Sequence, residues 1–427
     1  MKGAEQNWEL ITLFSTNMKL TILLTIFTAV GTAFPLANWK WSDFQSLEAN
    51  EPRLIKLGPE EYQLVTESKK LEYKRLNTKF IDVTNQIPID EAIKNGMIEL
   101  SSVDRWTKSL TLGSSQLKQL NKPVPDYKYP TTFEHTKEIK NIYERIDTDL
   151  MHEKLTTFTS FFTRYYKSST GFESAKWLKK EILSIVEPVK VSGVDVKEVK
   201  HDGWDQFSII VSIPGENSEK VVIGSHQDSI NLLFPSLLKA PGADDNGSGT
   251  VTCLESLRLI AGGLADGFKP KNTLEFHFYS AEEGGLLGSI DVFHEYSKNK
   301  EIVIGMLQQD MTGYTAKTID AGVETHFGLI TDYTSVGLND FIKLVISEYC
   351  DIPYHETACG YACSDHSSAI ENGYPASFII ESEFKLSNNY IHSVMDTIDR
   401  LDWDHIKEHV KLTVAFAYEL SMADIKV

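Results

Sequence analysis

The sequence predicts an α/β sandwich built on a largely parallel β-sheet, and two observations support this fold class. From about residue 131 onward, short apolar runs typical of buried strands alternate with stretches of helical periodicity. In addition, the residues that stand out chemically follow directly after several of these apolar runs. Functional residues gather at the carboxyl ends of the strands in such sheets, so both observations indicate the same architecture.

The expected elements follow one another in a regular order. Helical periodicity comes first, at residues 134–160 and 174–186. The strand-like runs lie at residues 207–213, 221–225, 273–280, 302–308, 327–331 and 376–381. Further helices are expected at residues 249–261, 290–298, 338–349 and 405–422.

The N-terminus carries the features of a signal peptide. Met18 and Lys19 precede an apolar run at residues 20–30, and the small residues Gly31-Thr32-Ala33 then offer a cleavage site. The run is shorter than the about 20 residues of a membrane-spanning helix, although a retained anchor is the alternative. We therefore expect residues 1–33 to be a signal peptide, with Met18 as a second candidate start. The protein would be secreted, with a vacuole as the alternative destination.

Residues 34–121 lack the repeating α/β pattern, and a proline-rich stretch at residues 121–130 then reads as a linker. In an exported enzyme, such a segment is typical of a propeptide that covers the active site or assists folding. A small additional domain is the alternative interpretation. Residues 122–427 then form the main, catalytic domain.

The composition excludes several classes of partner. The 427 residues carry a formal net charge of −18, and 41% of them are hydrophobic, as expected of a globular protein. This negative charge would be repelled by nucleic-acid phosphates and by anionic lipids. We therefore expect no nucleic-acid binding and no stable membrane association.

The four cysteines differ in their surroundings. Cys359 and Cys363 have a spacing that suits a local disulfide in an oxidising compartment. Cys253 lies in an apolar helical stretch and is expected to be a buried thiol, and Cys350 has no obvious partner.

Five segments of the chain place a carboxylate or an imidazole after a strand or in a loop. His226, the Glu282-Glu283 pair and Asp310 each follow a strand-like run, and the Asp244-Asp245 pair and His392 lie in loops. Taken singly, such residues are usually surface charges, helix caps or turn residues. Their joint occurrence indicates a metal site, and mixed imidazole and carboxylate donors suit zinc.

These segments resemble the dinuclear zinc aminopeptidases, as found among bacterial leucyl aminopeptidases and fungal secreted leucine aminopeptidases. The matching stretches, in the order of that family, are Gly224-Ser-His226-Gln-Asp228, Pro241-Gly-Ala-Asp-Asp-Asn-Gly-Ser-Gly249, Ser280-Ala-Glu-Glu-Gly-Gly-Leu-Leu-Gly-Ser289, Leu307-Gln-Gln-Asp310, Cys359-Gly-Tyr-Ala-Cys-Ser-Asp-His366 and Ile391-His392. The resemblance implies a three-layer sandwich with a central mixed, mostly parallel sheet. It also implies a hydrolase that holds two zinc ions per chain.

The resemblance further implies a role for each matching residue. One zinc ion would be held by His226 and Glu283, the other by Asp310 and His392, and Asp245 would bridge the two. The pattern also implies a cis peptide bond between Asp245 and Asn246.

Two carboxylates and a tyrosine would complete the chemistry. Asp228 would accept the other ring proton of His226 and fix its tautomer. Glu282 would be the general base that takes a proton from the attacking water and returns it to the leaving amine. Tyr361, between the two cysteines, would donate a hydrogen bond to the developing oxyanion.

The expected substrate is a peptide or protein N-terminus with a free amine, cleaved by a monomer. The side-chain pocket predicts a preference for large hydrophobic residues such as leucine. It is expected to be formed by Met311, Ile330, Phe378, Ile380, Phe384 and Ile391, beside Cys359, Tyr361 and Cys363.

Three other interpretations remain open at the level of the sequence. A glutaminyl cyclase uses related ligands with one zinc ion, so metal stoichiometry would distinguish it. A carboxypeptidase or dipeptidase would need a basic clamp, and the metal motifs contain no arginine or lysine. An inactive binding module would typically lack a ligand or the base, whereas Glu282 and all five ligands are present.

Overall fold

An eight-stranded sheet forms the centre of the fold, in the strand order β10-β9-β11-β8-β6-β7-β5-β4. The structure is a computed structural model that describes residues 51–98 and 122–425. The strands of this sheet are β4 (Asp195–His201), β5 (Trp204–Ile213), β6 (Asn217–His226), β7 (Asn272–Tyr279), β8 (Val303–Gln309), β9 (Phe327–Ile330), β10 (Tyr354–Thr357) and β11 (Ala376–Ile380). The pairs β6/β7, β6/β8, β8/β11 and β9/β10 are parallel, and the pairs β4/β5, β5/β7 and β9/β11 are antiparallel. The expected mixed, mostly parallel sheet is confirmed.

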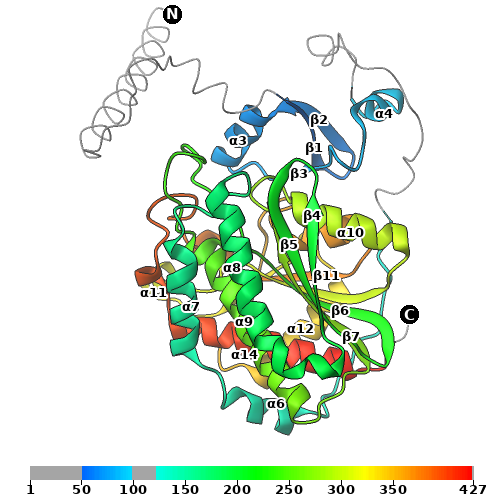
Figure 1. The fold of residues 1–427 in the computed structure, drawn as a ribbon, viewed down its shortest axis with the longest axis vertical. Helices are drawn as coiled ribbons and strands as arrows, with labels where there is room; N and C mark the ends of the chain where they lie inside the picture. Colours follow the sequence, from blue (N-terminus) through cyan, green and yellow to red (C-terminus); the bar gives the residue numbers. More distant parts are fainter. Residues whose placement is uncertain (1–50, 99–121, 426–427) are drawn as a thin grey trace, which may run out of the picture. The chain divides into compact units, whose positions relative to one another are not determined.

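Helices cover both faces of this sheet, which confirms the expected three layers (Figure 1). The helices are α6 (Thr136–Tyr143), α7 (Thr148–Ser160), α8 (Ser169–Val186), α9 (Gly249–Ala265), α10 (Leu287–Asn299), α11 (Ala316–Asp320), α12 (Val336–Tyr349), α13 (His366–Glu371) and α14 (Trp403–Met422). Alternate residues of β6 enter two separate cores. Val221 and Ile223 belong to the core that includes α8, α9, α12 and α14, whereas Val222 packs with Phe293 of α10 on the other face.

The structure adds two strands that were not expected and divides one expected helix. The strands β4 and β10 were not predicted, because each lies at an edge of the sheet and lacks a continuous buried run. The single helix expected at residues 134–160 is divided into α6 and α7. Asp147 begins the second helix, since its side chain accepts a hydrogen bond from the backbone N–H of Leu150 at 2.9 Å.

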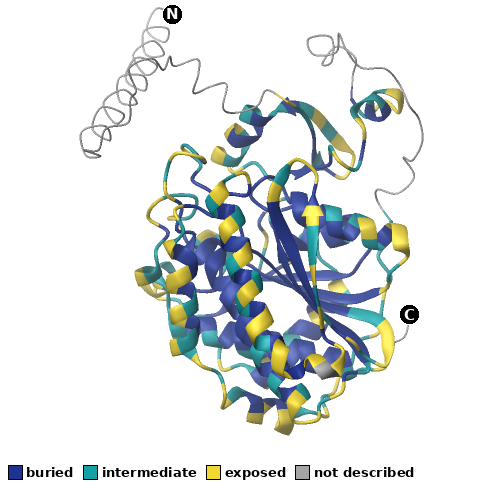
Figure 2. Ribbon diagram, in the orientation of Figure 1, coloured by how far each residue is buried: buried dark blue, intermediate teal, exposed yellow. Residues whose placement is uncertain are grey.

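The central strands β7 and β8 are buried along their whole length, whereas the outer helices expose one side (Figure 2). Every residue of β7 and β8 is buried, as are the last six residues of β6. Polar residues at the carboxyl ends of these strands are therefore removed from solvent. Such residues need partners, since an unpaired buried charge is costly.

The N-terminal part of the described chain forms a second, smaller sheet in the order β2-β1-β3. Its elements are β1 (Pro52–Gly58), β2 (Glu61–Thr66), α3 (Glu67–Arg75), β3 (Ile81–Asp82) and α4 (Ile89–Lys94). Leu54 and Ile81 share an apolar cluster with Leu286 and Ala362 of the large sandwich. This region, residues 51–98, is called the N-terminal segment below.

Part of the predicted domain organisation lies outside the described residues. The expected signal peptide, residues 1–33, is among these parts, as are residues 34–50 and 99–121. Among the helices of the described chain, none has the length and apolar character needed to cross a membrane.

Candidate metal centre and active site

Three adjacent parallel strands bring ligand candidates to one edge of the large sheet. His226 is the last residue of β6, Asp310 follows β8 directly, and Glu283 lies in the turn after β7. The strands stand in the order β8-β6-β7, so their carboxyl ends lie side by side. Asp245 and His392 reach the same edge from loops.

The five side chains form two groups that share Asp245. In the first group, Nε2 of His226 lies 3.2 Å from Oδ1 of Asp245 and 3.3 Å from Oδ1 of Asp310. In the second, Nε2 of His392 lies 2.9 Å from Oδ2 of Asp245 and 3.3 Å from Oε2 of Glu283. Each oxygen of the Asp245 carboxylate therefore faces a different group, which is the arrangement of a bridging ligand.

This geometry corrects the expected pairing of the ligands. The resemblance implied that His226 pairs with Glu283, and that Asp310 pairs with His392. In the structure, His226 lies with Asp310, and His392 lies with Glu283. The order of motifs along the chain does not reveal which strand ends and loops face each other, so the pairing required the three-dimensional structure.

The donor atoms of the site fit a bound cation. Among the described residues, Nε2 of His226, Oε1 of Glu283 and Oδ1 of Asp310 are buried without a hydrogen-bond partner, although buried polar atoms are normally paired. Burial alone would lower the pKa of His392, but the carboxylates of Glu283 and Asp245 raise this pKa to about 10. The site therefore attracts positive charge, and its imidazole and carboxylate donors suit zinc.

A buried arginine holds two of the metal-bearing loops in place. Arg164 is fully buried, and its Nε donates to the carbonyl oxygen of Gln227 at 2.9 Å. Its Nη2 donates to the carbonyl oxygen of Gly242 at 2.8 Å, and its Nη1 donates to that of Pro241. Sequence reasoning missed this residue, because its partners lie far away along the chain and no motif marks it.

A second unpredicted residue, Asp396, fixes the loop of the bridging carboxylate. Its two oxygens accept the backbone N–H groups of Asp244 at 2.9 Å and of Asp245 at 3.1 Å. The peptide bond between Asp245 and Asn246 is cis, as expected. The sequence contained a weak signal for Asp396, since it lies four residues after His392 in the same loop.

The two carboxylates expected beside the ligands lie there. Asp228 is fully buried, and its Oδ1 lies 3.3 Å from Nδ1 of His226. Glu282 lines the cavity in front of the metal site but belongs to neither ligand group. Burial raises the pKa of Glu282 to about 8, although the ammonium of Lys74 and the imidazole of His226 act in the opposite direction.

A lysine of the N-terminal segment reaches into this site. Nζ of Lys74, the second-last residue of α3, lies 2.6 Å from Oε2 of Glu283 and 3.4 Å from Oε2 of Glu282. A second lysine, Lys79, lies over the ring of Phe384 at 5.5 Å from its centroid. Neither contact was predicted, because both join residues that are more than two hundred positions apart in the chain.

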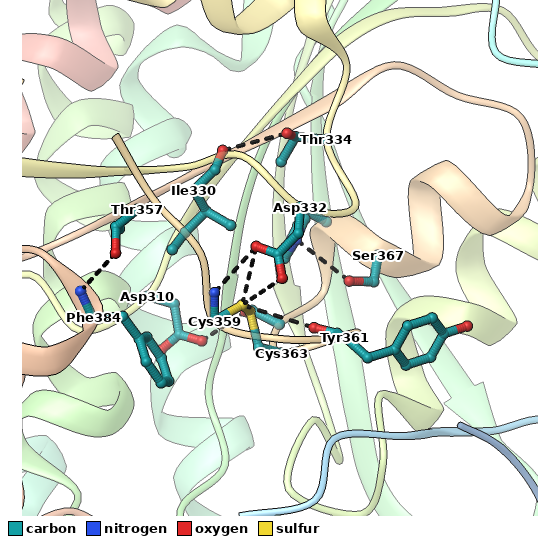
Figure 3. Close-up of a disulfide and its surroundings, with 12 residues drawn as sticks. Asp310, Ile330, Asp332, Thr334, Thr357, Cys359, Tyr361, Cys363, Ser367 and Phe384 are labelled. Carbon is teal, nitrogen blue, oxygen red and sulfur yellow. Dashed lines mark hydrogen bonds between the residues drawn. A yellow bond between two sulfur atoms is a disulfide. The ribbon is translucent and has the colours of Figure 1, made fainter. Parts of the chain in front are cut away.

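Cys359 and Cys363 form a disulfide, whereas Cys253 and Cys350 are free (Figure 3). Directly after this bridge, Oγ of Ser364 donates to Oδ2 of Asp310 at 2.6 Å. Tyr361 lies between the two cysteines, but its side chain points away from Asp310. Its hydroxyl group contacts Tyr333 and Glu371 instead of facing the ligand groups.

A cavity with both polar and apolar walls opens beside the candidate metal ligands. Its volume is about 640 Å³, and Asp245, Glu282, Asp310 and His392 line one end. The expected pocket residues that line it are Met311, Phe378, Ile380, Phe384 and Ile391. Ile330 belongs to the same apolar cluster but lies behind the lining, fully buried. The N-terminal segment contributes another part of the wall through residues 74, 75 and 77–80.

Comparisons with known proteins find aminopeptidases that are similar to this chain. Residues 208–417 match a family profile described as "Peptidase family M28". Probable aminopeptidase YDR415C of Saccharomyces cerevisiae is 48% identical over 371 residues, covering 86% of this chain and 92% of that protein. Leucine aminopeptidase 1 of Phaeosphaeria nodorum is 44% identical over 416 residues, covering 96% of this chain and 100% of that protein.

A solved structure extends this agreement to the fold. The LapA aminopeptidase of Legionella pneumophila superposes with a TM-score of 0.71 at 27% sequence identity, covering 87% of this chain and 99% of that one. Both the inferred resemblance and the enzyme class it implied, a zinc-dependent aminopeptidase, are confirmed. The chain belongs to peptidase family M28.

Proposed function

We propose that this chain is an exported aminopeptidase that uses two zinc ions to remove large apolar residues from peptide N-termini. The observation that carries the proposal is the pair of ligand groups joined by Asp245 at the end of a cavity that has an apolar wall. His226 and Asp310 would hold one ion, Glu283 and His392 would hold the other, and Asp245 would bridge them. Bound zinc would supply a Lewis acid that polarises the scissile carbonyl and lowers the pKa of the attacking water.

Glu282 is the proposed general base. It lines the cavity without joining either ligand group, so its carboxylate can exchange protons once Lys74, which lies 3.4 Å from it, has left. The Glu282 carboxyl would take the proton of the attacking water and deliver it to the leaving amine. The backbone N–H of Glu282 donates to Asp228 at 3.0 Å, which holds the base at a fixed place beside the ligands.

The cavity supports a preference for N-terminal residues such as leucine. Its carboxylate-rich end favours a free α-ammonium group, and its apolar wall favours a large aliphatic or aromatic side chain. Tyr361 would donate to the oxyanion after its hydroxyl leaves Tyr333 and Glu371. An N-acetylated peptide lacks the ammonium group and is expected to be a poor substrate.

We further propose that residues 34–121 are a propeptide, and that the described part of it keeps the enzyme inactive. The cavity wall formed by residues 74–80 supports this proposal, since it lies where a substrate would enter. The ammonium of Lys74 contacts the carboxylates that would receive the substrate amine, and Lys79 covers the ring of Phe384. The segment would thus occupy both the polar and the apolar end of the cavity.

The proposed setting is outside the cell or in a vacuole, and the proposed active form is a monomer. The signal-like sequence at residues 1–33 and the disulfide between Cys359 and Cys363 support export, since disulfides persist in oxidising compartments. The net charge of −18 supports a role away from nucleic acids and anionic membranes.

The test is hydrolysis of leucine p-nitroanilide by the purified chain before and after limited proteolysis. Each sample is measured with a chelator and again after zinc is restored, bound metals are counted, and N-acetylleucine p-nitroanilide is run in parallel. Chelator-sensitive cleavage of the free-amine substrate alone, with two zinc ions per chain, is the expected result. A single zinc ion together with cyclisation of N-terminal glutamine would instead identify a glutaminyl cyclase.

A further inference from the structure

We propose that Lys56 and Glu371 form a lock that holds Tyr361 turned away from the metal centre. Through this lock, the N-terminal segment would control the enzyme at a second place, separate from the contact of Lys74 with the ligands. Glu371 would then be a positioning residue, since it acts on the reaction through Tyr361. The inference rests on the proposed function of Tyr361 as an oxyanion donor and deepens it by naming its regulation.

The lock begins with a buried ion pair between the two parts of the chain. Lys56 lies in β1 and is fully buried, and its Nζ lies 2.6 Å from Oε2 of Glu371 at the end of α13. The Glu371 side chain is also almost completely buried. Such a pair is a poor source of stability compared with apolar side chains of similar volume, but losing one partner strands the other charge in the interior. The charge of Glu371 is therefore tied to the presence of β1.

The second oxygen of the same carboxylate binds the tyrosine pair. Oε1 of Glu371 accepts hydrogen bonds from the hydroxyl groups of Tyr333 and Tyr361, the latter at 3.3 Å. The two tyrosine hydroxyls also contact each other, and their rings pack edge to face at a centroid distance of 4.4 Å. Lys56, Glu371, Tyr333 and Tyr361 thus form one continuous polar network.

Apolar packing from the N-terminal segment covers this network. Tyr333 and Tyr361 pack against the cluster that contains Leu54 and Ile81 of the N-terminal segment. When that segment leaves, the tyrosines lose this apolar cover, and Glu371 loses the ammonium of Lys56 at the same time. Water would then reach the carboxylate and replace the tyrosine hydroxyls as its hydrogen-bond donors.

The position of Tyr361 in the chain connects this network to the active site. Figure 3 shows the Tyr361 ring extending away from Asp310, on the far side of the disulfide loop. The next two residues, Ala362 and Cys363, line the cavity, and Ser364 donates to the ligand Asp310. A rotation of the Tyr361 side chain would therefore bring its hydroxyl from Glu371 to the cavity while the disulfide keeps the loop in place.

A mutant cycle in the full chain tests this inference. All variants carry Lys74→Met, so that the contact of Lys74 with the ligands does not mask the effect of the lock. Into this background we introduce the pair Lys56→Met with Glu371→Leu, the single change Tyr361→Phe, and all three substitutions together. We measure kcat and KM for leucine p-nitroanilide and the zinc content. Lys69→Met is the matched control, since Lys69 is an exposed lysine of α3 that pairs only with Glu72 among the described carboxylates.

The pair Lys56→Met with Glu371→Leu removes the carboxylate that holds the tyrosine hydroxyls and leaves no unpaired charge. We expect this pair to raise kcat about 10-fold or more, with KM and zinc content nearly unchanged, because a single oxyanion donor is worth about 100-fold or more in kcat. The rise should disappear when Tyr361 is phenylalanine. Lys56→Met alone keeps the carboxylate, which then depends on the tyrosine hydroxyls as its donors, so this variant should show no such rise. A kcat that stays constant, or that rises equally without the tyrosine hydroxyl, would overturn the lock.

The proteolysed wild-type chain separates this inference from the function on which it rests. If that chain cleaves leucine p-nitroanilide but kcat is the same in all variants of the cycle, the lock is wrong and the aminopeptidase proposal stands. If it cleaves no substrate with two zinc ions bound, the proposed function fails and the lock fails with it.

Discussion

Asp228 joins His226, a proposed metal ligand, to the turn that carries the proposed base, Glu282. Its Oδ1 lies 3.3 Å from Nδ1 of His226, and its two oxygens accept the backbone N–H groups of Glu282 at 3.0 Å and of Glu283 at 3.2 Å. One carboxylate thus orients an imidazole at the end of β6 and fixes the turn after β7. Because the two strands are parallel neighbours, a single residue sets the relative position of ligand and base.

Replacing this carboxylate should loosen both elements. In Asp228→Asn, one acceptor oxygen becomes an N–H donor that faces the backbone donors of Glu282 and Glu283. We expect zinc affinity and kcat each to fall about 10- to 100-fold, as for other carboxylates behind a ligating histidine. Competition with a zinc-binding dye measures the affinity, and the exposed Asp205→Asn serves as the control. Unchanged affinity in Asp228→Asn would show that His226 does not depend on this partner.

The base proposal predicts a variant that keeps its metal and loses its activity. Glu282→Gln retains the shape of the side chain but cannot accept a proton, so kcat should fall about 100- to 10,000-fold. Metal content should remain that of the wild type, since Glu282 belongs to neither ligand group. Steady-state kinetics after limited proteolysis and a metal count provide the measurement, with the exposed Glu295→Gln as control. Full activity in Glu282→Gln would refute the proposed mechanism.

The contact of Lys74 with Glu283 predicts that a single substitution activates the uncut chain. Lys74→Met removes the ammonium from the carboxylates and leaves the remainder of α3 intact, so substrate amines no longer compete with it. We expect the kcat/KM of the uncut chain to rise about 10-fold or more, because an opposite-charge contact at a partly buried site is worth more than about 1.4 kcal/mol. Activity after limited proteolysis should match that of the wild type. The exposed Lys69→Met should change neither value.

Features formed by residues that are close in the chain could be predicted from the sequence, whereas features formed by distant residues could not. The strands β6, β7 and β8 were predicted because they lie in the middle of the sheet and contain buried runs rich in apolar residues. Their ends identified His226, Glu283 and Asp310. The edge strands β4 and β10 were missed, since residues exposed on one side leave no such run. Their burial patterns contain intermediate and exposed positions throughout.

Contacts between distant parts of the chain could not be predicted at all. Arg164 reaches Pro241 and Gly242, and Lys74 reaches Glu283, but neither residue lies in a recognisable motif. The pairing of His226 with Asp310 has the same origin, because it depends on which strand ends face each other. Residue types and spacing therefore indicated the chemistry of the site, whereas its internal geometry depended on tertiary packing.

The apolar wall of the cavity predicts how substrate preference can be changed. Ile380 is almost fully buried at this wall, so Ile380→Phe would place added volume where a leucine side chain is expected to bind. The ratio of kcat/KM for leucine over alanine p-nitroanilide should fall about 10-fold or more, since single methylene differences in apolar pockets are worth that much. Ile304→Phe, a matched change in the core of β8 away from the cavity, should lower stability but leave the ratio unchanged. An unchanged ratio in Ile380→Phe would place the specificity pocket elsewhere.

We expect the N-terminal segment to stabilise the fold in a pH-dependent way through the carboxylate of Asp82. This fully buried carboxylate lies 2.6 Å from Nζ of Lys70 and 2.8 Å from Nε of Arg53. Burial alone would raise the pKa of Asp82, but the two cations outweigh it and lower this pKa from 3.8 to about 2. Because the folded pKa is the lower one, the stabilisation is fully present above about pH 4 and is lost as the pH falls through about 2.

The shift in the pKa of Asp82 corresponds to about 2 kcal/mol of unfolding free energy. Denaturant unfolding of the wild type and of Asp82→Asn from pH 5 to pH 2 measures it, with the exposed Asp202→Asn as control. The difference in stability between wild type and Asp82→Asn should shrink by about 2 kcal/mol over this range, because asparagine does not titrate. Other acidic groups cancel in this difference, so a constant value from pH 5 to pH 2 would mean that the cations do not hold the carboxylate in its charged form.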